Sequence, residues 1–416
     1  MRDVDLYRHL LGIAQPWTVT QVDLSVVEQR VDVWVGHADG LQWACPECDS
    51  QQGVFDHTQE RIWRHLDSCQ FKTYLHARAP RVRCPEHGVR QAKLPWAEPH
   101  SRFTALFERL AIDILREATV LGAARISGLS WDEAWHIMEK AVARGLVAKG
   151  DRVAKRIGVD EKSVGKGQQY FTIVVDLDGG TVEHIVDDRK QSSLDSFFES
   201  RSEAQLGGIE AIAMDMWKPY IQSALEHLPG AESKIVFDRF HIMKHMVQAV
   251  DDVRKRENKD LRALGDDSLT GSKYAWIYSR ENRPDKYRQL FSSLKAQDLK
   301  TGRAWSIKES LRDLWSYVSP AWAEKHWKHW YFWATHSRLQ PVIDKARMIQ
   351  RHIGNVMTYF KHRITNAMSE GLNSTIQEIK HSARGFRNRE HFKTAIYFHL
   401  GGLELYPVSV SHRNPG

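Results

Sequence analysis

The spacing of apolar residues changes along the chain and predicts different kinds of structure in turn. Residues 19–36 (VTQVDLSVVEQRVDVWVG) alternate apolar and polar positions, which predicts two short strands. After residue 101 the apolar positions recur at helical spacing, as at Phe103, Phe107, Leu110 and Ile114. We therefore expect a β-rich segment near the N-terminus, followed by helices.

After this helical segment, two apolar-patterned helices are predicted within residues 118–142, interrupted at Gly128 and Ser130. Ser130 is a suitable N-cap for the second helix, because Glu133 three residues later completes the pattern of a capping box. A short turn between two helices in a basic protein is typical of a helix-turn-helix, which binds DNA. An ordinary pair of packed helices fits the pattern equally well.

The composition becomes that of an α/β domain at Arg156. RIGVD and QYFTIVVDL are rich in β-branched and aromatic residues, and a turn at 178–180 leads to a third strand, TVEHIV. Two more strands, IEAIAMD and KIVFD, alternate with predicted helices. A long helical region follows, in which seven of the fifteen tryptophans lie between Trp276 and Trp333. The tail after Tyr359 predicts one basic amphipathic helix and a final apolar helix.

Composition and charge narrow the class of protein. The net charge of +7 favours a polyanionic partner without identifying one. No apolar run approaches the ~20 residues that span a bilayer, and the N-terminus lacks the apolar core of a signal peptide. Four cysteines in 416 residues are too few for a disulfide scaffold. We expect a cytoplasmic protein, associated with the nucleoid when it is bound to DNA, and no membrane partner.

Two ligand pairs with the same spacing predict one structural zinc ion. Cys45-Pro-Glu-Cys48 and Cys84-Pro-Glu-His87 can together present four sulfur and nitrogen donors to Zn²⁺. The alternative is a pair of buried free thiols with a chance histidine. Cys69 has no partner at this spacing, and we expect it to be a core thiol.

Basic residues are dense around the second ligand pair. In a DNA-binding module they would suit phosphate contacts, although a solvated basic face is the alternative. The candidates are Arg61, Arg64, Arg78, Arg81 and Arg83.

Three acids are candidates for a catalytic metal site. Asp160 and Asp215 each end a predicted strand, so neighbouring strands would bring both carboxylates to one edge of a sheet, where they could bind Mg²⁺ or Mn²⁺. Glu370 lies on a predicted helix, on the same face as Asn373 and Lys380. From spacing alone, the better interpretation of Glu370 is a favourable partner for the helix dipole.

The whole chain resembles the insertion-sequence transposases of the ISL-three family. The motifs that carry the resemblance occur in the family's order: CPEC, WRHLD, YLHARAPRVRCPEHGV, GVDEKSVGKGQQYFTIVVDLDGG, MDMWKPY, FDRFHIMK and ITNAMSEGLNSTIQEIKHSARGFRN. The resemblance implies a ribonuclease H-like core whose three acids hold two metal ions. Carried over by motif, these acids are Asp160, Asp215 and Glu370. Asp238 and His241 match a further family motif, and we expect them beside the metal site.

The resemblance also completes the expected domain organisation. We predict a zinc-binding DNA-recognition module (1–98), a helix-turn-helix (99–150), the first part of the ribonuclease H-like core (151–250), an all-helical insertion (251–355) and the C-terminal helices of the core (356–416). The insertion follows from the 155 positions that separate the second and third acids. Residues near the acids could hold DNA or stack on a base: Lys162, Lys166, Trp217, Lys218, Lys380 and Arg384. Packing at the sheet edge is the alternative for Trp217.

The expected activity is that of a transposase. It would bind the terminal inverted repeats of its element, cleave the ends and join them to target DNA, using two Mg²⁺ or Mn²⁺ ions. Because joining involves two ends, we expect at least a homodimer. The alternatives are a ribonuclease H-like nuclease that cuts without joining, and a DNA-binding regulator with an inactive α/β domain.

Overall fold

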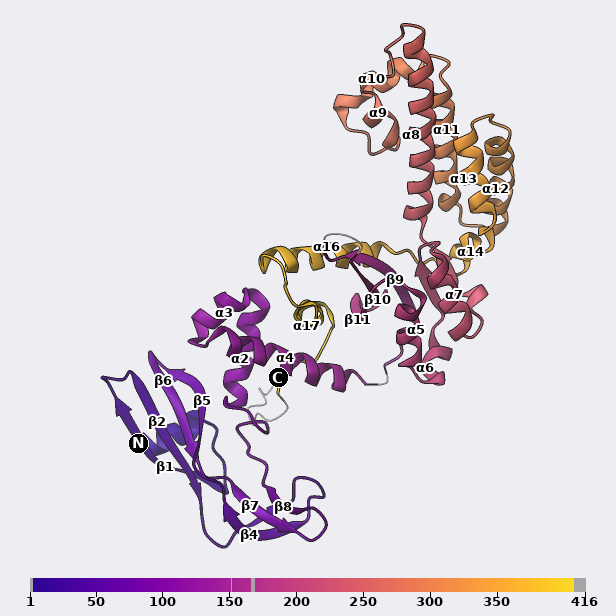
Figure 1. Cartoon of the computed structure of the whole chain (residues 1–416). Coiled ribbons are helices and arrows are strands. Elements are labelled where there is room, and N and C mark those ends of the chain that lie inside the picture. The colour runs from indigo at the N-terminus through magenta and orange to yellow at the C-terminus, as the bar shows by residue number, and fades with distance from the viewer. Residues whose placement is uncertain (1–2, 151, 166–168, 408–416) are drawn as a thin grey trace. The chain divides into compact units, whose positions relative to one another are not determined.

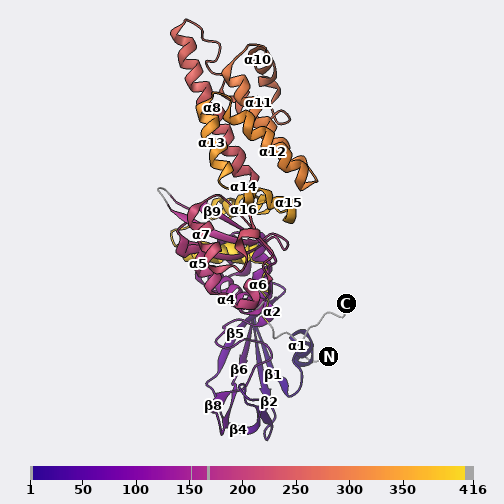
Figure 2. The ribbon, with the colours of Figure 1, turned by 90° about the vertical axis from the view of Figure 1, so that its right-hand side faces the viewer.

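The computed structural model describes residues 3–150, 152–165 and 169–407 (Figures 1 and 2). The chain forms two compact units. The first contains Met1–Gly150 and Ile379–Gly416, and the second contains Asp151–Glu378. Each unit has its own hydrophobic core and is described by itself below.

The first unit begins with α1 (Asp3–Leu10) and two four-stranded sheets. One has the order β1-β2-β6-β5, and the other is antiparallel with the order β3-β4-β7-β8. Trp17, Trp63 and Trp96 form edge-to-face contacts in the core beneath the first sheet. The strands are β1 (Trp17–Ser25), β2 (Arg30–His37), β3 (Gln42–Ala44), β4 (Gln51–His57), β5 (Arg61–Ser68), β6 (Phe71–Ala77), β7 (Pro80–Cys84) and β8 (Gly88–Gln91). The two strands expected in residues 19–36 are confirmed as β1 and β2.

Helices α2 (Ala105–Glu117), α3 (Val120–Ser127) and α4 (Trp131–Lys149) complete this unit together with α17 (Arg389–Leu400). The predicted break is confirmed, since Gly128 ends α3 in the left-handed conformation and Ser130 caps α4 in a capping box with Glu133. Phe398 of α17 packs in the same core as α2 and α4. The last helix was expected to complete the catalytic core, but its apolar face is buried in the first unit instead.

The second unit is built on a five-stranded sheet with the order β11-β10-β9-β12-β13. Strand β10 (Tyr170–Asp176) is antiparallel to both β9 (Arg156–Ser163) and β11 (Thr181–Asp187), whereas β9, β12 (Ala211–Met214) and β13 (Ile235–Phe237) are mutually parallel. Apolar residues of α5 (Gln191–Glu199) and α7 (Lys218–His227) share a core with β9 and β12, and α6 (Glu203–Gly208) lies between these helices in the chain. The predicted strands are therefore present in the predicted order.

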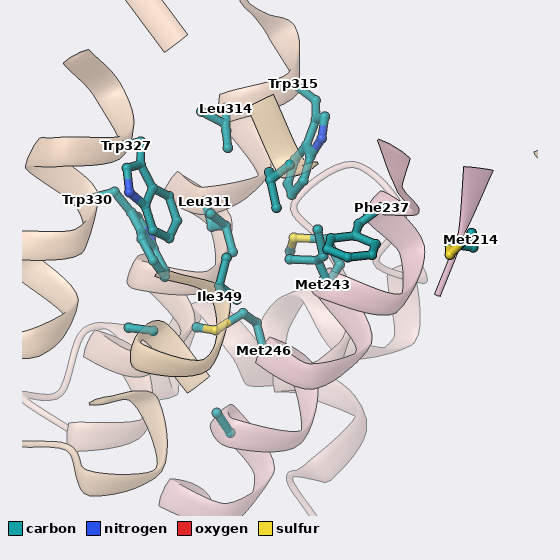
Figure 3. Packing of buried hydrophobic residues seen from close by; sticks show 14 of the residues in the cluster. Met214, Phe237, Met243, Met246, Leu311, Leu314, Trp315, Trp327, Trp330 and Ile349 are labelled. Carbon is teal, nitrogen blue, oxygen red and sulfur yellow. The ribbon is translucent and has the colours of Figure 1, made fainter. Parts of the chain in front are cut away.

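A helical region follows β13 and ends before α16 (Ala367–Ser382). It comprises α8 (Arg239–Ala263), α9 (Lys273–Ile277), α10 (Asp285–Lys295), α11 (Lys300–Arg312), α12 (Pro320–Thr335), α13 (Gln340–Gln350), α14 (Ile353–Met357) and α15 (Tyr359–His362), with a 3-10 turn at Asp313–Ser316; another 3-10 turn, Ala231–Ser233, precedes β13. The expected boundary at residue 250 falls inside α8, which continues without a break. Met243 and Met246 of α8 pack between Phe237 of the sheet and Leu311, Trp315 and Ile349 of the helices (Figure 3).

The tryptophans of this region are mostly core residues. Trp276, Trp305, Trp315, Trp327 and Trp330 are buried, whereas Trp322 and Trp333 are exposed. Among the helices of the described ranges, none has both the length and the apolar character needed to cross a membrane.

Candidate functional site

The predicted zinc ligands lie together at two hairpin turns of the antiparallel sheet. Cys45 and Cys48 follow β3, Cys84 is the last residue of β7, and His87 lies between β7 and β8. The Sγ atoms of Cys48 and Cys84 are 3.6 Å apart, and Nδ1 of His87 lies 3.5 Å from Sγ of Cys84 and 3.9 Å from Sγ of Cys45. A tetrahedral zinc ion with metal–ligand bonds of about 2.0–2.3 Å needs ligand separations of roughly 3.5–3.8 Å. The four residues therefore fit a structural zinc ion.

The local backbone explains why these side chains converge. The amide of Asp49 donates to the carbonyl of Cys45, and the amide of Cys45 donates to the carbonyl of Ser50, which curls the chain around the first ligand pair. Gly88, at φ +70°, permits the matching turn after His87. Hydrogen bonds donated by the backbone and side chain of His87 lower the pKa of the Cys84 thiol to about 6, which favours the thiolate that binds metal.

Cys69 is not part of this cluster. The prediction that it is a core thiol is wrong, because it is exposed in the turn between β5 and β6 at φ +58°. The turn is short, so its central residues have no apolar layer above them.

In the second unit, the parallel strands bring three acids to one level. Ala213 of β12 pairs with Gly158 of β9, and Met214 pairs with Phe237 of β13. Continuing the first pairing by two residues places Asp215 opposite Asp160, and continuing the second by one residue places Asp215 opposite Asp238. Neighbouring strands are separated by about 4.8 Å, so these acids occupy adjacent positions. Asp160 lies within β9 rather than at its end, because pairing with β10 continues to Ser163.

The N-terminal half of α16 is held against the same strand. A Cβ atom at Gly158 would lie 2.6 Å from Oδ1 of Asn366 and 2.6 Å from Oγ of Ser369, so a larger residue would require these side chains to shift. Asn366 also donates to the carbonyl of Val159, at 3.4 Å. Gly158 is two residues from Asp160 and so faces the same side of the sheet. The contact therefore places the start of α16, which carries Glu370, on the side of the sheet where the acids lie.

Asn373 connects the helix directly to the first acid. Its side chain donates to Oδ2 of Asp160 at 2.7 Å, and its carbonyl accepts from Nζ of Lys162 at 2.8 Å. Lys162, expected to contact DNA, thus has a structural partner. The motif had placed Asn373 on the same helix face as Glu370, but neither its bond to Asp160 nor the close approach at Gly158 could be read from the spacing.

Electrostatic effects connect Asp160, Asp238 and Glu370, and each of them is influenced by His241. Burial raises the pKa of Asp160 to about 6, while the neighbouring charge of His241 acts in the opposite direction. Burial also raises the pKa of Asp238 and Glu370, and the charge of Asp238 adds to the rise at Glu370. Nδ1 of His241 lies 3.7 Å from Asp215 and 3.9 Å from Asp238. A divalent cation would offset the mutual repulsion of these carboxylates.

The carboxylate oxygens of the three predicted catalytic acids do not all lie within the distance expected of ligands to one metal ion. Within residues 3–150, 152–165 and 169–407, the groups of three or more ligating side chains whose ligand atoms all lie within 4.8 Å are the cysteine–histidine cluster and a second group of Asp195, Glu226 and His227. Asp160, Asp215 and Glu370 are not such a group. Their carboxylates are nevertheless hard oxygen donors that suit Mg²⁺ or Mn²⁺.

The residues expected to contact DNA differ in their surroundings. Arg64 is buried, bonds the carbonyl of His65 and pairs with Asp67, so its placement favours a structural role over a phosphate contact. Arg81 pairs with Asp56 through two hydrogen bonds. Arg61 donates to the carbonyl of Ser101. The exposed candidates are Arg78, Arg83 and Arg384; Lys380 is half-buried, and Lys166 lies outside the described residues.

Trp217 lies next to Asp215 on the surface of the second unit. It is 38% exposed, and its Nε1 donates to the carbonyl of Arg189. The guanidinium of Arg189 lies 5.1 Å from the ring of Trp217 and 4.3 Å from that of Tyr170. The indole is therefore held in place while part of it remains exposed to solvent.

Comparisons with known proteins match the zinc-binding segment, the helices that follow it and the second unit. Family models match a transposase domain at residues 157–396, a zinc finger of the transposases IS204/IS1001/IS1096/IS1165 at 41–87, and the helix-turn-helix domain of transposase family ISL3 at 92–142. Similar proteins include the transposase for insertion sequence element IS1001 of Bordetella parapertussis, 27% identical over 84% of this chain and 86% of the relative. The transposase for IS1557 of Mycobacterium tuberculosis is 25% identical over 97% of this chain and 96% of the relative. The helix-turn-helix interpretation of α2–α4 is confirmed, and the chain belongs to the ISL3 (ISL-three) family of transposases.

Proposed function

We propose that this protein binds the terminal inverted repeats of its element and catalyses metal-dependent cleavage and strand transfer at Asp160, Asp215 and Glu370. The observation that carries the proposal is the common level of Asp160, Asp215 and Asp238 on three parallel strands, with α16 fitted against Gly158 on the same side. The strand order β11-β10-β9-β12-β13, with the first three strands antiparallel and the last two parallel to β9, supports a ribonuclease H-like core.

The residues of the site have distinct tasks. Asp160, Asp215 and Glu370 would hold two divalent ions and leave coordination positions open for phosphate oxygens. When bound, such ions activate a water or a DNA 3′-hydroxyl and stabilise the leaving alkoxide. Asn373 fixes the orientation of Asp160 through its hydrogen bond. His241 lies between Asp215 and Asp238, where its charge would moderate their repulsion.

Recognition and chemistry would be divided between parts of the chain. The zinc module and the helices α2–α4 precede residue 150, whereas the three acids lie between residues 160 and 370. Groove contacts are needed to choose the element ends, while the acids can act on any phosphodiester that reaches them. Because two ends are joined to one target, we expect the protein to act as at least a homodimer on paired ends.

Strand-transfer assays with Mg²⁺ on the element's own ends test the proposal. Asp160→Asn, Asp215→Asn and Glu370→Gln should each abolish cleavage and joining while leaving binding to the repeats intact. Asp178→Asn, which changes an acid outside the site, is the matched control. Ordinary turnover by the Asp215→Asn protein would refute the assignment. Cleavage without joining of a pre-cut end would identify a nuclease, and repeat binding without any cleavage would identify a regulator.

A further inference from the structure

An aromatic groove runs along α12 in the helical region of the second unit. It has a volume of about 650 Å³, and its lining includes Trp327, Tyr331, Phe332, His336 and Met357. Phe332 is 63% exposed, although it lies on a helix whose other aromatic residues include the buried Trp327 and Trp330. The imidazole of His336 stacks on the Phe332 ring with centroids 4.0 Å apart. The groove therefore presents flat rings to solvent.

The surrounding chain is strongly basic. Residues 320–363 contain eight Lys and Arg but only two Asp and Glu, a net charge of +6, compared with +7 for the whole protein. One of the two acids, Glu324, lines the groove and is paired with Lys328 at 2.8 Å. On the same helix, Nζ of Lys325 lies 5.0 Å from the exposed ring of Trp322. Cations and exposed aromatic rings thus alternate along α12.

This combination favours one occupant over the others. A second copy of the chain docked by the same face would bring two segments of charge +6 together, which disfavours self-association there. A single DNA strand offers a phosphate backbone for the cations and bases whose faces stack on aromatic rings. Paired bases are stacked inside the duplex and cannot reach the floor of a groove, so the occupant must be unpaired.

We propose that the α12 groove binds an unpaired nucleobase of DNA by stacking it against Phe332, with nearby Lys and Arg holding the flanking phosphates. The proposal rests on membership of a DNA-processing family and not on the assignment of the catalytic acids. It gives the helical region a function in recognising DNA that has locally lost its pairing.

A binding assay with the full-length, zinc-loaded protein and no added divalent ion tests this proposal. The probe is a duplex that carries one unpaired 2-aminopurine, and the reference is the same duplex fully paired. We expect tighter binding of the unpaired probe, with quenching of its fluorescence. Phe332→Ala should weaken binding of that probe about tenfold without changing binding of the paired duplex, and Phe332→Trp should retain the preference.

The matched control is Tyr274→Ala, which removes another exposed aromatic ring of the helical region, on α9 and outside the groove lining. It should bind both probes as the wild type does. Equal binding of both probes by wild type and Phe332→Ala would overturn the proposal. So would sedimentation showing that Phe332→Ala only dissociates an oligomer, because the groove would then hold a second copy. Since no divalent ion is added, an error in the catalytic assignment would leave this result unaffected.

Discussion

The cysteine–histidine cluster and the proposed carboxylate site differ in how their side chains are brought together. In the first unit, Cys45, Cys48, Cys84 and His87 already lie at the separations of a tetrahedral site, although β4, β5, β6 and most of β7 separate the pairs in sequence. In the second unit, Asp160, Asp215 and Glu370 share an environment but their oxygens are not gathered around one point.

The two arrangements differ because the ligands differ in charge and because they are attached to different backbone elements, turns in one case and strands and a helix in the other. Thiols and imidazoles can be neutral and can hydrogen-bond one another, so turns of the backbone can hold them in contact. Carboxylates repel, and burial makes the repulsion stronger. Strand register in the sheet fixes the backbone positions of Asp160 and Asp215 despite the repulsion between their carboxylates. Glu370, the third acid of the proposed site, comes from a separate helix, α16. The zinc site therefore depends on its turns, and the carboxylate site depends on the packing between β9 and α16.

Loss of zinc should give the largest effect. Cys48→Ser removes a ligand, and we expect the sheet of β3, β4, β7 and β8 to unfold, because structural zinc contributes roughly 10–16 kcal/mol of folding free energy in small zinc modules. Zinc content and thermal unfolding of the full chain measure this. Cys69→Ser is the matched control, since Cys69 is also exposed but lies outside the cluster. Full zinc occupancy in Cys48→Ser would contradict the ligand assignment.

The two regions should respond to acid with opposite sign in the absence of added divalent ions. Burial lowers the pKa of His65 from 6.5 to about 4, so its contribution to stability decreases as the pH falls through 6.5 towards 4. Burial raises the pKa of Asp160 from 3.8 to about 6, so its unfavourable contribution grows as the pH rises from 3.8 towards 6. In each case the free energy of unfolding changes by at most about 3 kcal/mol.

Hydrogen exchange followed by mass spectrometry can measure the stability of each unit between pH 4 and 7. His65→Asn should flatten the pH dependence of the first unit, and Asp160→Asn should flatten that of the second. Each variant serves as the control for the other unit. If His65→Asn leaves the slope of the first unit unchanged, another group dominates its response to acid.

The next largest effect should come from disturbing the packing between β9 and α16, and we expect it in the rate of end cleavage. Gly158→Ala would place a Cβ atom 2.6 Å from the side-chain oxygens of Asn366 and Ser369. Because these two side chains are buried and hydrogen-bonded to each other, we expect α16 to shift and carry Glu370 with it. A displacement of about 1 Å at a catalytic group costs on the order of 100-fold in rate. We expect that loss in end cleavage with unchanged repeat binding and zinc content. Gly207→Ala is the control, because a Cβ atom there meets nothing within 4 Å.

The sequence predicted the elements better than their assembly. The capping box at Ser130 and Glu133 was readable because a cap depends on residues within one turn. The final helix was assigned to the wrong unit, because its apolar face shows that it is buried but not against which partner. Periodicity also could not locate the start of the insertion, since α8 serves both the sheet and the helical bundle.

At the candidate sites, too, the sequence predicted features that depend on neighbouring residues but not those that depend on distant packing. Ligand spacing predicted the zinc cluster because each pair lies within a single turn. Arg64 was a candidate DNA contact because basic residues are dense in this segment, but its side chain is buried, pairs with Asp67 and bonds the carbonyl of His65. The role of Gly158 depends on a helix about 200 residues away, and no local pattern records it.

The smallest effect should come from the hydrogen bond between Asn373 and Asp160. Asn373→Ala removes a donor 2.7 Å from Oδ2, which frees the carboxylate to rotate without changing its backbone position. Residues that orient metal ligands typically contribute 10- to 100-fold, and we expect about tenfold here because the backbone amide of Glu161 still bonds Oδ1. The loss should appear as a higher Mg²⁺ concentration for half-maximal cleavage, with unchanged thermal stability. Ser374→Ala, at an exposed position one residue further along α16, is the control. If Asn373→Ala lowers the cleavage rate equally at all Mg²⁺ concentrations, Asn373 does not act through the metal ligand, and the dependence of this site on helix packing must arise at Gly158 alone.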